Sequence, residues 1–133
     1  MKLQINGEVR LYQDTGRAIS ELMTDRQLGA IFKLSMYIHE DVNALVRNPN
    51  EKDLTKVVLL SQSELADICG LSYGSFRNLL SGLREHGALE TVGIGYTGLS
   101  HKAIVLNPWI ADCNSDHPNG EKVRALFRDY RNK

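Results

Sequence analysis

The stretch that decides the fold is SQSELADICGLSYGSFRNLLSGLREHGALE, residues 61–90. Its first four residues, 61–64, have the S-x-x-E pattern of a capping box, which starts a helix. Gly70 interrupts that helix, and Ser72 then caps a longer helix that ends at Gly87. The spacing therefore predicts two helices joined by a tight turn.

Apolar residues within 62–81 stand where two crossing helices contact each other. Ala66 is the small residue at the crossing, because a bulkier side chain there would push the helices apart. Gly70 lies in the turn, where the chain needs a left-handed conformation. The pattern is that of a helix-turn-helix. Its expected core positions are Leu65, Cys69, Leu71, Phe76 and Leu79.

Two short stretches with a period of two residues follow the helix pair. Residues 88–92 and 102–106 are predicted strands, because successive side chains of a strand point to opposite faces. Between them, VGIGYTGLSH at 92–101 contains a G-x-G-x-x-G spacing. A dinucleotide site needs a helix after such glycines, and a strand is expected here instead. The segment therefore predicts the tip of a hairpin, and the whole unit predicts a winged helix.

The flanking segments complete the expected fold. An Asn-Gly turn within 2–12 predicts a β-hairpin, and T-x-x-Q starts a helix over 24–40. Residues 45–46 and 57–60 are possible strand pieces around a polar loop. Apolar side chains at helical spacing over 121–133 predict a C-terminal amphipathic helix. We therefore expect an α+β, mostly α fold, namely a winged helix-turn-helix with an N-terminal β-hairpin and a C-terminal amphipathic helix.

Length and composition indicate a single domain. The chain has 133 residues and no linker, so we expect an arm at 1–23, a winged core at 24–108, and a loop with the last helix at 109–133. Basic and acidic residues number 16 each, so the net charge is zero and DNA binding has to come from local charge. Two cysteines without C-x-x-C, no signal sequence and no membrane-length apolar run favour a cytoplasmic protein.

The outer face of the second helix carries side chains suited to DNA. Arginine pairs with guanine and asparagine with adenine, while hydroxyls bind phosphates. The acids Glu64 and Asp67 lie on the first helix, so charge is separated between the two helices. The predicted recognition-helix residues are Ser72, Tyr73, Ser75, Arg77, Asn78, Ser81 and Arg84. Two further groups are Ser61 and Gln62 at the first helix N-terminus, and Tyr96, Thr97, Ser100, His101 and Lys102 on the wing.

Each of these residues also has a structural interpretation. Arg77 and Arg84 can be ordinary solvated helix residues. Tyr73 can pack on the core, because a buried tyrosine contributes a large apolar surface. The C-terminal apolar stripe can dock on the first long helix, or it can form a homodimer interface that matches two DNA half-sites.

Taken in order, these features resemble the RepL-type plasmid replication proteins of Gram-positive bacteria and similar phage winged-helix proteins. The matching text covers 23–38, an Asn followed by apolar residues at 43–46, residues 61–90, and the strand entering Asn-Pro at 105–108. The resemblance implies binding to double-stranded DNA at a replication origin, with host replication proteins as partners. A glycine-rich wing and the polar loop at 111–120 depart from that pattern. The same fold also serves transcriptional repressors and protein-interaction modules that never bind DNA.

Other polar constellations predict little chemistry. Ser115, Asp116 and His117 are adjacent in sequence, and adjacent residues do not aim at one another as a catalytic triad requires. Cys113 and His117 have a C-x3-H spacing, but a zinc site needs about four ligands. Trp109 is expected to anchor the C-terminal segment to the core. We therefore expect no enzymatic activity, no cofactor and no metal.

Overall fold

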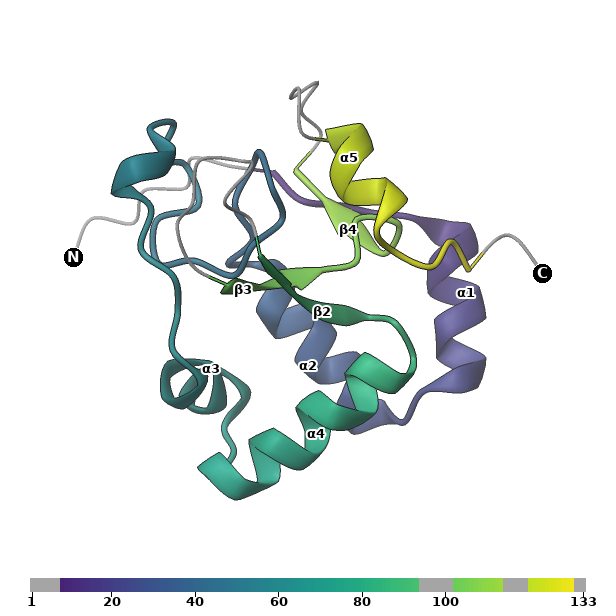
Figure 1. Ribbon diagram of the computed structural model, residues 1–133. Coiled ribbons are helices and arrows are strands. Elements are labelled where there is room, and N and C mark those ends of the chain that lie inside the picture. Colours follow the sequence, from purple (N-terminus) through teal and green to yellow (C-terminus); the bar gives the residue numbers. More distant parts are fainter. Residues whose placement is uncertain (1–7, 94–101, 114–119, 131–133) are drawn as a thin grey trace.

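A computed structural model describes residues 8–93, 102–113 and 120–130 of the chain (Figure 1). The described residues form an α+β fold with five α-helices, one short 3-10 helix and two two-stranded antiparallel sheets. In chain order the elements are β1 (Arg10–Leu11), α1 (Gln13–Leu22), α2 (Asp25–Ser35), η1 (Leu54–Lys56), α3 (Gln62–Cys69), α4 (Tyr73–Glu85), β2 (Leu89–Gly93), β3 (Lys102–Leu106), β4 (Ala111–Asp112) and α5 (Gly120–Ala125). None of these helices is long and apolar enough to cross a membrane.

The N-terminal region contains a helix that the sequence analysis did not predict. Residues 1–7, which hold the expected hairpin turn, lie outside the described residues. β1 pairs with β4, with Leu11 opposite Ala111. α1 lies within residues 1–23, where a hairpin and arm were expected. Its start carries no side-chain cap and Gly16 stands inside it, so the usual helix signals are missing.

The helix pair and the hairpin behind it form as predicted. The Ser61 hydroxyl accepts a hydrogen bond from the Glu64 backbone N–H, and the Glu64 carboxylate accepts one from the Ser61 backbone N–H, which completes the capping box of α3. Gly70 has φ +69°, the left-handed conformation expected in the turn. Ser72 caps α4 by accepting from the backbone N–H of Ser75. β2 and β3 then pair antiparallel, with Leu89 opposite Leu106.

α2 ends earlier than the sequence analysis predicts. Thr24 and Gln27 form the expected capping box, but the helix stops at Ser35 instead of about residue 40. The chain then doubles back, with Ile38 bridged to Leu45 and the N–H of Val46 donating to Tyr37 O at 2.9 Å. Of the strand pieces expected at 45–46 and 57–60, only Leu45, Val46 and Leu59 form bridges, with Val46 opposite Leu59, and no longer strand forms there.

The core consists of two adjoining clusters. The larger one joins α1, α2, α3, α4 and the ends of the β2–β3 hairpin around Phe76, Leu34 and Leu65. Leu65, Cys69, Phe76 and Leu79 are buried as predicted, whereas Leu71 is only half-buried. The smaller cluster packs Val42, Ala44 and Val46 against β3, Val123 and Phe127.

The C-terminal segment docks on its own chain. α5 has six residues and is much shorter than the helix expected over 121–133. It lies at the opposite end of the molecule from α4 (Figure 1). Val123, Phe127 and Tyr130 are buried, and Leu126 alone of the four stripe residues is exposed, at 51%. The indole N–H of Trp109 donates to Arg124 O at 3.2 Å, as expected of an anchor. Most of the stripe's apolar surface is thus covered within the chain itself. A homodimer through this stripe stays a prediction.

Two buried asparagines hold these parts together. Asn107 is fully buried; its amide N–H groups donate to Gly87 O and Arg128 O at 2.9 and 2.8 Å, and its oxygen accepts from the Trp109 N–H at 2.8 Å. Asn43, with φ +59°, donates to Leu106 O and Ala111 O at 3.0 and 2.8 Å. Each amide donates to two backbone carbonyls. Asn107 and Asn43 therefore connect the end of β3 to the turn after α4, to β4 and to the chain beyond α5.

We predict that Asn107→Ala lowers the free energy of unfolding by about 3 kcal/mol, because several buried groups lose their hydrogen bonds at once. Denaturant unfolding measures this change. Asn78→Ala serves as the control, because Asn78 is exposed on α4 and its loss should change stability by no more than about 0.5 kcal/mol. Equal effects of the two substitutions would contradict the role given to Asn107.

Candidate nucleic-acid interface

The polar face of α4 is exposed along its whole length. Every residue predicted for the recognition helix is exposed: Ser72, Tyr73, Ser75, Arg77, Asn78, Ser81 and Arg84. The opposite face is buried, with Phe76, Leu79, Leu80 and Leu83 in the core. The structure therefore brings these predicted residues together on one surface that no described part of the chain covers.

Tyr73 lies at the surface and contacts both helices of the pair. Its side chain is 48% exposed, so the alternative that it packs in the core is wrong. Its hydroxyl donates to Gln62 Oε1 at 3.3 Å, and the guanidinium of Arg77 lies over its ring, 5.9 Å from the centroid. A cation over an aromatic face is attracted by the ring, so Tyr73 restricts the directions that Arg77 takes. Tyr73 thus contacts both Gln62 and Arg77.

Arg84 has a different environment from Arg77. Its guanidinium donates a hydrogen bond to the hydroxyl of Thr91 on β2. The bond joins the last turn of α4 to the hairpin. Arg84 is therefore oriented toward the hairpin side of the exposed face, whereas Arg77 lies on the α3 side.

The N-terminus of α3 carries an ion pair that sequence reasoning missed. Arg47 Nε and Nη2 donate to the two carboxylate oxygens of Glu64 at 2.6 and 2.7 Å. The hydrogen bonds from Arg47, and then from the Ser61 backbone, lower the pKa of Glu64 from 4.5 to about 2. The negative charge of Glu64 is thereby balanced beside the predicted phosphate-binding end of α3. No spacing rule links the two residues, because Arg47 comes from the loop before η1.

The wing residues are only partly placed. Tyr96, Thr97, Ser100 and His101 lie outside the described residues, and Lys102 begins β3. The catalytic-triad look-alike at 115–117 also lies outside them. The β2–β3 pairing does extend to Gly93 opposite Lys102, so the segment 94–101 connects two adjacent strand ends.

The cysteines and the histidine that could carry chemistry elsewhere in the described residues have structural environments. Burial raises the pKa of the Cys113 thiol to about 11 and also raises the pKa of Cys69, which disfavours both thiolates. The buried His39 ring has Nε2 2.6 Å from Glu51 O and accepts at Nδ1 from the Asp41 N–H. No group of three potential metal ligands gathers in the described parts of the chain.

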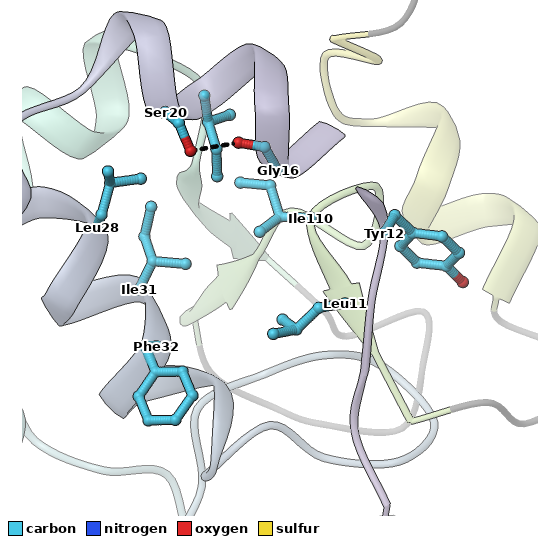
Figure 2. A pocket seen from close by; sticks show the side chains of 9 residues that line it. Leu11, Tyr12, Gly16, Ser20, Leu28, Ile31, Phe32 and Ile110 are labelled. Atoms are coloured by element: carbon cyan, nitrogen blue, oxygen red, sulfur yellow. Dashed lines mark hydrogen bonds between the residues drawn. The ribbon is translucent and has the colours of Figure 1, made fainter. Parts of the chain in front are cut away.

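A pocket of about 200 Å³ lies between α1, α2 and β1 (Figure 2). Leu28, Ile31 and Phe32 line it from α2 and Ile110 from the segment before β4, while the ring of Tyr12 points away from them in Figure 2. The only hydroxyl shown near its α1 wall, that of Ser20, donates to Gly16 O at 2.6 Å within the helix. The lining is mostly apolar, and none of its residues belongs to the predicted DNA-binding set.

The comparisons with known proteins add nothing to the geometry of the site. No family model, no curated protein and no solved structure matches this chain.

The Arg47–Glu64 pair makes a pH-dependent prediction. Because folding lowers the pKa of Glu64, its stabilising effect is present above about pH 4.5 and is lost as the pH falls through about 2. We therefore expect Glu64→Gln, which keeps the capping box, to lower the melting temperature at pH 7 but not at pH 2.

Thermal unfolding of both proteins across this pH range measures the effect. Arg47→Ala is the matched control, since removing the partner cation should shrink the pH-dependent difference. A difference between Glu64→Gln and the parent protein that stays constant from pH 7 to pH 2 would contradict the assignment.

Proposed function

We propose that α3, α4 and the β2–β3 hairpin form a winged helix that binds double-stranded DNA in a sequence-specific manner. The observation that carries the proposal is the uncovered polar face of α4, opposite a face that is wholly buried. A helix presented in this way fits the major groove, which is about 12 Å wide. The hairpin that follows is in the right place in the chain to act as the wing.

The residues on this face divide by chemistry. Arg77 and Asn78 provide the bidentate side chains that distinguish guanine and adenine in the major groove. Ser72, Ser75 and Ser81 offer hydroxyls that position a phosphate backbone without reading sequence. Tyr73 orders Arg77 before any ligand arrives, which reduces the conformational entropy lost on binding. The α3 N-terminus with Gln62 and the predicted wing residues add contacts to the neighbouring backbone.

The neutral total charge limits non-specific attraction. Phosphate contacts release counterions, and a protein with few of them loses little affinity as salt rises. We therefore expect this protein to depend more on base contacts and less on general attraction than a strongly basic DNA-binding protein does.

The proposed biological role is that of a plasmid or phage replication initiator or regulator. This part of the proposal rests on the sequence resemblance to RepL-type proteins, with host replication proteins as expected partners. The alternative role is transcriptional repression by the same fold. Footprinting over the DNA that surrounds the gene distinguishes them, because repeated sites favour an origin and overlap with a promoter favours repression.

Selection from a random library of DNA duplexes, carried out at two salt concentrations, tests the function. We expect one recurrent sequence to be enriched at both concentrations. An inverted repeat with half-sites about 10 base pairs apart would indicate a homodimer. Recovery of unrelated sequences at both concentrations would contradict sequence-specific binding. Binding without any dependence on salt would favour a winged helix that interacts with protein.

Arg77→Ala should remove the preference for the selected site and leave the free energy of unfolding within about 1 kcal/mol of the parent value, because the side chain is exposed. Arg77→Lys is the matched variant. It keeps the charge but not the bidentate geometry, so non-specific binding should persist while site preference falls. Fluorescence anisotropy with the selected duplex and a scrambled duplex measures both. Full site preference in Arg77→Ala would show that another surface reads the DNA.

A further inference from the structure

A second hollow flanks α4 on the side away from Tyr73. Its volume is about 260 Å³, and it is formed by one side of α2, the α3–α4 turn and the near side of α4. The lining residues are Arg26, Gly29, Ala30, Lys33, Cys69, Leu71 and Leu79. At about 100° per residue, Leu79 lies about 240° round the helix from Tyr73, and Ser75 lies about 200° round the helix from Tyr73. Ser75 and Leu79 are therefore only about 40° apart. Ser75, a predicted DNA contact, therefore shares this flank of α4.

α2 is held firmly beside α4 at this hollow. A Cβ atom at Gly82 on α4 would lie 2.8 Å from Nε2 of Gln27, so the end of the Gln27 side chain from α2 contacts α4 there. Both helices also belong to the larger core cluster through Leu34, Leu79 and Leu83. The cations on α2 are thus fixed relative to the exposed face of α4.

Arg26 and Lys33 are the two cations of this hollow, and both are exposed. Neither forms an ion pair with an acidic side chain of the described residues, whereas Arg47 and Arg124 are both paired with acids. The two residues are seven positions apart, which places them about 10 Å apart along the same side of α2. Gly29 lies between them and presents no side chain.

We propose that Arg26 and Lys33 bind one sugar-phosphate strand of the DNA whose bases α4 reads. The inference rests on the proposed function and adds a second surface to it. A helix in the major groove has a phosphate backbone on each side, because the groove is bounded by both strands. On one side of α4 lie Gln62 and the N-terminus of α3. On the other side lie Arg26, Lys33 and Ser75, with Leu71 and Leu79 as an apolar floor beneath the strand.

Charge complementarity favours a sugar-phosphate strand as the occupant of this hollow. Two unpaired cations about 10 Å apart can contact two phosphates of one strand, whereas a single small anion would contact only one of them. Phosphate contacts carry no sequence information, so the two cations should contribute affinity and salt dependence without changing which bases are preferred.

The test compares Arg26→Ala, Lys33→Ala and the double variant with Arg17→Ala. Arg17 is an exposed cation on α1, outside both flanks of α4, and its guanidinium lies 4.0 Å from the Asp14 carboxylate. Binding of the selected duplex is measured by anisotropy from 50 to 200 mM salt, with melting temperatures as a check on folding. Each lost phosphate contact reduces the slope of log affinity against log salt by about 0.9.

The double variant should therefore lose roughly tenfold less affinity than the parent protein over that salt range, with an unchanged preference for the selected sequence. Arg17→Ala should have the parent slope. An unchanged slope in the double variant would overturn this inference alone, because the parent protein would still bind DNA. A relaxed base preference would also overturn it, since the cations would then read bases. Failure of the parent protein to bind any duplex would overturn the proposed function together with this inference.

Discussion

The structure depends on the buried amide of Asn107. Its three hydrogen bonds join the turn after α4, the start of the segment after β3 and the chain beyond α5, so three parts distant in sequence meet at one side chain. Asn43 does the same for the end of β3 and β4. Because unsatisfied carbonyls are costly in a core, these amides specify a single arrangement of the hairpin on the helices. That arrangement leaves the polar face of α4 uncovered.

Sequence reasoning predicted the central helix pair because its signals are local. Two capping serines, Gly70 in the turn and a period of 3.6 decide α3 and α4 without help from the rest of the chain. α1 was missed because it has no cap and is stabilised by burying Ile19 against distant residues. The C-terminal helix was predicted too long, because its periodicity continues where Asn107 and Trp109 fix the chain by tertiary contacts. The asparagines that mark the family resemblance have a structural role in these contacts.

The candidate site was predicted as a set of residues but not as an arrangement. Helical periodicity identified the exposed face of α4, since burial and exposure alternate regularly on a helix. It gave no sign that Tyr73 joins Gln62 to Arg77, that Arg47 balances Glu64, or that α2 places Arg26 and Lys33 beside α4. These relations connect separate elements, and only the packing of the helices brings them together.

We propose the outer face of α4 as the surface that binds DNA. Amide chemical shifts recorded while a duplex is added test it most directly, because they report contacts residue by residue without any substitution. The largest changes are expected on 72–84 and on the side of α2 that carries Arg26 and Lys33, with little change in α1 and α5. Changes centred on the apolar pocket between α1, α2 and β1, with α4 unaffected, would contradict it.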